Sequence, residues 1–201
     1  MYSIIKETVS EIEVERSRFI GIITHIENIE EIKDIITSIK KKYPKARHYC
    51  YAATIDGNKK YSDDGEPQGT AGKPMLDVLE KKNLTNVLIV VVRYFGGILL
   101  GSGRLLRTYV ETTIKTISAS EIVKIAEGYE IEFSVDYPNY DIIRNFLKTK
   151  GIQIDKVDFL ENVLVTTFSL EDYSEEIASK FYGKVLIKKV LKKVAYTKEG
   201  I

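Results

Sequence analysis

The sequence has few of the residues on which common catalytic and metal sites depend. Its 201 residues include one cysteine, Cys50, and two histidines, His25 and His48. A single cysteine excludes an internal disulfide and suits a reducing compartment. The sequence contains no G-x-S-x-G, H-E-x-x-H or C-x-x-C motif. It therefore carries none of these hydrolase, zinc-protease or thiol-redox signatures.

Long apolar segments and an excess of one charge are absent too. The run VLIVVV near the middle is far too short to span a bilayer. Acidic residues are scattered through the N-terminus, which does not resemble a signal peptide. The 30 basic and 29 acidic residues give a net charge of +1, so there is no general attraction to nucleic acid or membrane. We expect a cytoplasmic protein without a membrane segment.

The apolar residues, 44% of the chain, are sufficient for a packed core, and their spacing predicts an α+β protein. In the first part the pattern predicts strands within 3–14 and over 18–26, 48–55 and 86–95. It predicts helices over 28–43, 73–82 and 104–118. The strand over 86–95 is almost continuously apolar, which indicates burial on both of its faces.

The second part, from residue 121, has a pattern of its own. Strands are predicted over 129–137, 152–160, 163–170 and 185–197, and helices over 138–150 and 173–184. The order β-α-β-β-α-β is that of the ferredoxin-like split βαβ fold. We therefore predict two domains, 1–120 and 121–201. Paired lysines in the last strand could form a basic patch for RNA, but protection of a sheet edge explains them better.

The distribution of charged residues indicates that the functional site lies in the first part. Residues 1–120 hold 18 basic and 15 acidic side chains, and residues 121–201 hold 12 and 14. Six of the seven arginines lie in the first part. Arginine is the better bidentate ligand for phosphate and carboxylate, so an anion site is expected there.

The first candidate site is the stretch YSDDGEPQGTAGKP, residues 61–74. Asp63, Asp64 and Glu66 could hold a divalent cation, but a solvated turn explains the same residues, and we predict no metal site. Gly69 and Thr70 lead into the next helix, with Thr70 as its predicted N-cap. The free amides there could bind an anion, or could belong to a capped helix and nothing else.

The second candidate is VVRYFGGILLGSGRLLR, residues 91–107, which joins the buried strand to a helix. Its four glycines are Gly96, Gly97, Gly101 and Gly103. Ser102 stands where the Walker pattern needs lysine, and Leu106 stands where the dinucleotide pattern needs glycine, so neither fingerprint is present. Arg93, Arg104 and Arg107 would repel one another, so we expect them to face acids or a bound anion. The acids of residues 61–74 are the expected internal partners.

The third candidate is the pair His48 and Cys50, whose H-x-C spacing places both side chains on one face of a strand. A zinc site would need further ligands from distant residues, and a Cys–His nucleophile would need access to solvent. The alternating neighbours indicate a half-buried strand instead. We therefore assign the pair a structural role.

The two glycine-rich stretches, in this order and separated by a helix and a strand, resemble the YigZ/IMPACT family. RSRFIG near the start and HYCYA upstream of residue 61 fit the same family. The resemblance covers residues 15–117, and the second part is similar to the second domain of bacterial members. Ser102 departs from the family pattern, in which another glycine is frequent.

The resemblance implies a fold and a setting. The first domain is expected to share the βαβ fold of a small-subunit ribosomal protein and of domain IV of elongation factor G. The second is expected to be similar to the last domain of that factor. Eukaryotic relatives of the first domain regulate translation by competing for an activator of a starvation-responsive kinase. RNA or the ribosome is thus the expected partner, without a cofactor. An enzyme acting on a small phosphorylated or carboxylated molecule, and a protein-interaction adaptor that regulates translation, remain alternatives.

These observations lead to one hypothesis about the site. We predict that residues 61–74 and 91–107 meet in space and form one surface site. The three acids would orient the three arginines. The amides near Thr70 and in the turn 101–103 would then bind a phosphate of RNA or of a small molecule.

Overall fold

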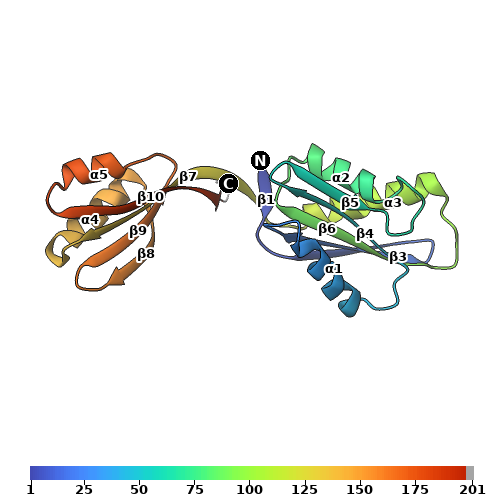
Figure 1. Ribbon diagram of the computed structural model, residues 1–201. Helices are drawn as coiled ribbons and strands as arrows, with labels where there is room; N and C mark the ends of the chain where they lie inside the picture. Colours follow the sequence, from blue (N-terminus) through green and yellow to red (C-terminus); the bar gives the residue numbers. More distant parts are fainter. Residues whose placement is uncertain (198–201) are drawn as a thin grey trace. The chain divides into compact units, whose positions relative to one another are not determined.

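The computed structural model describes residues 1–197 and divides into two compact units, Met1–Lys124 and Ile125–Thr197 (Figure 1). Each unit combines a β-sheet with helices, so the protein is a mixed α+β protein, as the sequence predicts. Among the helices of these residues, none is long and apolar enough to cross a membrane.

The first unit is a five-stranded antiparallel sheet with the order β2-β3-β6-β4-β5. Its elements are β1 (Tyr2–Ile4), β2 (Thr8–Val14), β3 (Ser17–His25), α1 (Glu31–Lys42), β4 (His48–Ile55), β5 (Asn58–Ser62), α2 (Gly72–Lys81), β6 (Val87–Tyr94) and α3 (Ser102–Ser118). The sequence pattern missed β5, because its side chains are mostly exposed and show no apolar alternation. The Asp56-Gly57 pair, with positive φ at both residues, is the turn signal that indicates this hairpin.

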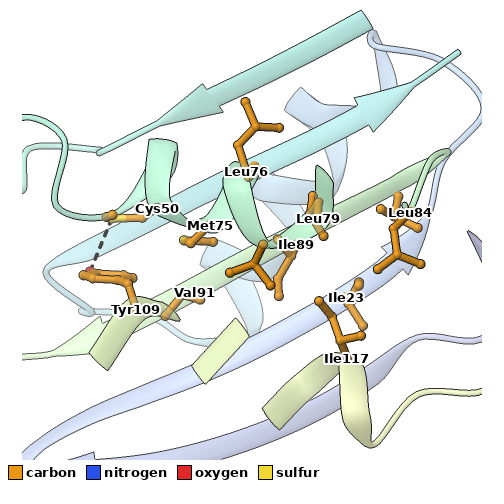
Figure 2. Packing of buried hydrophobic residues seen from close by; sticks show 14 of the residues in the cluster. Ile23, Cys50, Met75, Leu76, Leu79, Leu84, Ile89, Val91, Tyr109 and Ile117 are labelled. Atoms are coloured by element: carbon orange, nitrogen blue, oxygen red, sulfur yellow. Dashed lines mark hydrogen bonds between the residues drawn. The ribbon is translucent and has the colours of Figure 1, made fainter. Parts of the chain in front are cut away.

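The central strand β6 is buried on both faces, as its continuous apolar sequence predicts. Leu88, Val90 and Val92 belong to the core on the side of α1, and Ile89 and Val91 to the core on the side of α2 and α3. Figure 1 shows these helices on opposite sides of the sheet. Figure 2 shows the second core, in which side chains from α2 and α3 pack against the strands.

The alternation along β6 also positions a charged residue. Continuing from Ile89 and Val91, Arg93 points to the α2 and α3 side of the sheet. Its neighbours in register are Phe19 on β3 and His48 on β4. Arg93 is only 5% exposed. The strand thus carries a guanidinium to the end of the sheet, where β6 leads into α3.

Helix α3 approaches the sheet very closely over β3. A Cβ atom added to Gly21 would lie 2.1 Å from Thr116 Oγ1 and 3.1 Å from Thr112 Cγ2. Thr116 Oγ1 forms hydrogen bonds with Ser10 Oγ, at 2.7 Å, and with the carbonyl of Thr112, at 2.8 Å. The close contact between helix and sheet therefore depends on the absence of a side chain at Gly21.

We predict that Gly21→Ala lowers the free energy of unfolding by about 1–3 kcal/mol, because the added methyl group overpacks the contact with Thr116. In a Thr116→Ala background the obstructing oxygen is gone, and the cost of Gly21→Ala should become smaller. Urea unfolding of the two single variants and the double variant measures this coupling. Additive costs would contradict the predicted contact.

The second unit has the element order that the sequence predicts. It consists of β7 (Ile122–Val135), α4 (Tyr137–Lys150), β8 (Gln153–Phe159), β9 (Val163–Ser169), α5 (Ser174–Lys180) and β10 (Val185–Thr197). The strands lie in the order β10-β7-β9-β8. The first three residues of β7, Ile122–Lys124, belong to the first unit and pair there with β1. Asp136 caps α4 by accepting from the Asn139 amide, and Gly151 ends it with φ of 70°.

Candidate functional site

The two predicted loops meet at one end of the first unit, around a cavity of about 390 Å³. The cavity is lined by residues 65–67, by Arg93 and Phe95, by residues 99–102 and 105, and by Arg47 and His48 at the start of β4. Residues 61–74 and 91–107 thus contribute to one place, although a helix and a strand separate them in the sequence.

A buried ion pair connects the two loops. Arg93 Nη1 donates to Glu66 Oε1 at 2.7 Å, and the Tyr109 hydroxyl of α3 donates to the same oxygen at 2.8 Å. Glu66 is 8% exposed, so both charges are shielded from water. His48 Nε2 lies 3.8 Å from the other carboxylate oxygen of Glu66. One carboxylate therefore joins β6, α3 and the loop 61–74.

The guanidinium of Arg93 has a buried N–H group without a hydrogen-bond partner among the described residues. Its Cζ lies 5.2 Å from the ring centroid of Phe19 and 5.6 Å from that of Phe95, so two aromatic rings flank it. Its Nε is buried and has no hydrogen-bond partner among the described residues. A buried donor without a partner is rare, and here it belongs to a side chain that lines the cavity.

The Asp63 carboxylate accepts hydrogen bonds from the backbone amides that were predicted to bind an external anion. Its carboxylate accepts from the amides of Gly69 at 2.8 Å, Ala71 at 3.0 Å and Gly72 at 2.8 Å. These amides lie at and just before the N-terminus of α2, where donors have no partner within the helix. The predicted phosphate site near Thr70 is therefore filled by the protein itself.

Thr70 is not the N-cap of α2. The helix begins at Gly72 and its N-cap is Ala71. The Thr70 hydroxyl instead donates to the carbonyl of Pro67 at 2.6 Å, inside the loop. The prediction of Thr70 as cap was wrong because a carboxylate nine residues before the helix supplies the acceptor, which local spacing does not reveal.

Side chains of β4 hold the remaining acid of the loop. Asp64 accepts from the backbone amide of Tyr49 at 2.7 Å. His48 Nδ1 donates to the carbonyl of Asp64 at 2.8 Å, and Cys50 Sγ donates to the carbonyl of Asp63 at 3.0 Å. The three acids thus face three different partners. No cluster of His, Cys, Asp or Glu that could hold a metal ion occurs in the described part of the chain.

The other two predicted arginines do not face these acids. Arg104 Nη1 forms an ion pair with Glu15 Oε1 at 2.7 Å, and both side chains are exposed. Arg107 is exposed on the same helix, near Gly103. Their spacing places them on the outer face of α3, whereas Arg93 points into the unit. The prediction that all three acids orient all three arginines is correct only for Glu66 and Arg93.

The glycines of the turn have separate roles. A Cβ atom at Gly96 would lie 2.1 Å from the carbonyl carbon of Arg16, so only glycine fits there. Gly101 is the N-cap of α3 with φ of 75°, a left-handed conformation that favours glycine. The N-cap residue makes no side-chain hydrogen bond in α2 (Ala71) or in α3, but at α2 the Asp63 carboxylate accepts from the first amides. Gly97 also has positive φ, of 86°, and Gly103 lies in the first turn of α3.

More arginines lie toward this end of the first unit than the two loops supply. We name this set the arginine end: the exposed Arg16, Arg18, Arg47, Arg104 and Arg107, and the buried Arg93. The backbone of Arg16 contacts Gly96, and the Cζ atoms of Arg18 and Arg47 lie 5.6 Å from the Tyr94 ring and 5.5 Å from the Phe95 ring. The uneven distribution of arginine along the sequence was the signal for this surface.

Comparisons with known proteins identify the family to which this chain belongs. Residues 15–117 match the Impact N-terminal domain. A Haemophilus influenzae protein named IMPACT family member is 35% identical over 191 residues, which cover 89% of this chain and 91% of that protein. This chain belongs to the IMPACT family. The family match confirms the resemblance inferred from the glycine-rich stretches, over the same residues.

Further relatives span both units. The Bacillus subtilis IMPACT family member YvyE is 36% identical over 185 residues, covering 89% of this chain and 85% of the relative. A crystal structure of a hypothetical protein superposes with a TM-score of 0.63 at 28% identity, covering 92% of this chain and 95% of the other. Both matches therefore extend over the two units of the present chain.

Cys50 is the only thiol of this IMPACT-family protein, and it is buried beside Tyr109 (Figure 2). Cys50 Sγ lies 3.3 Å from the Tyr109 hydroxyl oxygen, while its single proton is directed at the carbonyl of Asp63. Burial raises the pKa of the Cys50 thiol far above its ordinary value, and burial likewise raises the pKa of the Tyr109 hydroxyl. The thiol is therefore not poised as a nucleophile, in agreement with the structural role assigned to it.

We predict that Asp63→Ala lowers the free energy of unfolding by about 1–2 kcal/mol, because it removes the acceptor for three amides at the start of α2. Asp77→Ala on the same helix is the control. Its exposed contact with Lys73 should be worth no more than about 0.5 kcal/mol. Urea unfolding measures both. Equal costs would contradict the role of Asp63 as the cap.

We also predict a specific loss of stability at alkaline pH. The pKa of Cys50 is higher in the folded protein than its ordinary value of 9.0. As pH rises above that value, the unfolded chain loses the thiol proton and the folded protein keeps it. Stability should then fall by up to about 1.4 kcal/mol per pH unit for this group.

The variant Cys50→Ala removes this contribution. Its stability, measured by urea unfolding between about pH 8 and about pH 10, should decline less steeply than that of the wild-type protein. Ionisation of the unfolded-state tyrosines affects both proteins equally and cancels in the comparison. Parallel declines would show that the Cys50 thiol is not held protonated by the fold.

Proposed function

We propose that this IMPACT-family protein is a binding protein of the translation system, and that its arginine end contacts RNA phosphates, including those of the ribosome. One observation carries the proposal: six arginines that are scattered between positions 16 and 107 gather at one end of the first unit. The role in translation is inferred from the family resemblance, because eukaryotic relatives regulate translation. A role in translation places the protein in the cytoplasm.

The arginine end has uncompensated charge. Arg18, Arg93 and Arg104 form ion pairs with Glu11, Glu66 and Glu15, respectively. Among the described residues, no carboxylate lies within 4.0 Å of the guanidinium groups of the other three, Arg16, Arg47 and Arg107. Guanidinium groups without an internal partner favour contact with phosphate. The small net charge of the chain predicts binding of modest affinity that depends strongly on salt.

The fold of the second unit also supports a role in translation. Its strand order β10-β7-β9-β8 corresponds to that of a ferredoxin-like domain. We propose that the two units are the two domains of the bacterial YigZ form, related to domains of elongation factor G. Fold alone does not establish function, so the arginine end remains the feature on which the proposal rests.

The decisive experiment is to remove three positive charges from the arginine end. We expect Arg16→Ala, Arg104→Ala and Arg107→Ala together to weaken binding of a labelled single-stranded RNA of mixed sequence. The dependence of log K on log salt should become shallower by roughly 0.7 for each phosphate that the variant no longer neutralises. Fluorescence anisotropy measures both quantities, and co-sedimentation with purified bacterial ribosomes provides the second readout.

The matched control removes three positive charges elsewhere in the same unit. Lys33 lies at the start of α1, and Lys81 and Lys82 lie at the end of α2; all three are exposed. The triple variant Lys33→Ala, Lys81→Ala and Lys82→Ala should retain RNA binding. If the two triple variants bind RNA equally, the arginine end is not the contact surface.

A further inference from the structure

We propose that the cavity between residues 65–67 and 99–105 binds the C-terminal end of a polypeptide, with the terminal carboxylate at the N-terminus of α3 and the last apolar side chain against the cavity wall. This site goes beyond the proposed contact with RNA, since its ligand is a protein. The proposal is carried by the uncapped helix, the donors of Arg93, the charge of the lining residues and the apolar rim.

The N-terminus of α3 is a suitable place for a carboxylate. Gly101 and Ser102, the N-cap and the first residue of the helix, both line the cavity, and no side chain caps the helix. The first amides of a helix favour negative charge. The same unit shows the arrangement at α2, where the Asp63 carboxylate accepts from the amides of Ala71 and Gly72. At α3 the first residues are exposed, so a carboxylate of another molecule could take the place of the water that solvates these amides.

A second observation points to a ligand independently of the helix. The side chain of Arg93 is 94% buried and lines the cavity, yet its guanidinium makes a single hydrogen bond, to Glu66, among the described residues. Its Nε has no partner. This Nε is fully buried and out of reach of the cavity, but a carboxylate there would accept from the Nη N–H groups that the protein leaves unused, which offsets part of the cost of burying the charge.

The charge of the lining residues fits a single negative charge. Of the lining arginines and carboxylates, Arg47 and Arg93 outnumber Glu66 by one. That surplus matches a carboxylate and is insufficient for a phosphate dianion. Most of the remaining wall is apolar, formed by Pro67, Phe95 and the leucines of residues 99–105. An apolar wall is unfavourable for a strongly hydrated phosphate and favourable for an apolar side chain next to a carboxylate.

The apolar surface extends beyond the cavity, which favours a polypeptide over a small acid. Leu99 is 88% exposed, and Ile98 and Phe95 are 39% and 37% exposed. A free amino acid would fill the cavity and leave this rim uncovered. A polypeptide would bury its last side chain in the cavity and cover the rim with the residues that precede it. Capture of a terminal carboxylate by backbone amides is a recurrent mode of peptide recognition.

The test compares two peptides that differ only at the end. We expect a fluorescein-labelled hexapeptide that ends in two leucines to bind the 201-residue protein when the C-terminus of the peptide is a free acid. The same peptide with an amidated C-terminus should bind at least about tenfold more weakly, because the charge-assisted hydrogen bonds are absent. Fluorescence anisotropy measures both. Equal binding of the two peptides would overturn the proposal.

Ser102→Asp separates binding from folding. An aspartate at the first position of α3 places a carboxylate of the protein itself at the helix N-terminus, which should raise the melting temperature. The same carboxylate should abolish binding of the acid peptide by repulsion. Ser102→Asn, which has the same shape without the charge, is the matched control and should retain binding. Unchanged peptide binding in Ser102→Asp would contradict the placement of the carboxylate.

Two further measurements identify the ligand. Leu99→Ser should weaken binding of the acid peptide, and free N-acetyl-leucine should compete poorly with it. If N-acetyl-leucine competes as well as the unlabelled peptide, the occupant is a small acid and the polypeptide proposal is wrong. If neither peptide binds and Ser102→Asp no longer binds RNA, the cavity is a phosphate site. Peptide binding that survives in the arginine triple variant, while RNA binding is abolished, separates this inference from the proposed function.

Discussion

The buried ion pair between Glu66 and Arg93 is the contact on which the end of the first unit depends. It joins an irregular loop to the central strand of the sheet, and Tyr109 extends the connection to α3. Removing one partner of such a pair leaves a buried charge uncompensated, at a cost of about 3–5 kcal/mol. The loops around the cavity are therefore held in place by charge, with the apolar core of Figure 2 behind them.

Two helices begin near this pair, and they differ in how their first amides are satisfied. Asp63 of the chain satisfies α2 internally, whereas α3 follows a glycine and has no side-chain cap. The two acids Asp63 and Glu66, three residues apart, thus have different roles: one completes a helix and the other neutralises a buried arginine. An acid-rich, glycine-rich loop is thus a set of internal connections to α2, β4 and β6.

Much of the fold could be predicted from local patterns, and the site could be predicted only in part. The continuous apolar run of β6 indicated burial on both faces. Strand β5 was missed because it is short, polar and exposed. Within the site, the meeting of the two loops and the contact of Glu66 with Arg93 followed from complementary charge. The partner of Arg104 did not, because Glu15 lies 89 residues away in the sequence.

The sequence by itself determined the family, the two-part organisation and the residue types of the site, because periodicity, turn residues and motifs are local properties. Only the tertiary structure decided which carboxylate accepts hydrogen bonds from which donor. Asp63 reaches the amides of α2 because Cys50 and His48 hold the loop against β4. Arg16, Arg18 and Arg47 join the arginine end because β2 and β6 end there and β3 and β4 begin there. Such pairings depend on strand register and helix approach, which arise when distant segments pack against one another.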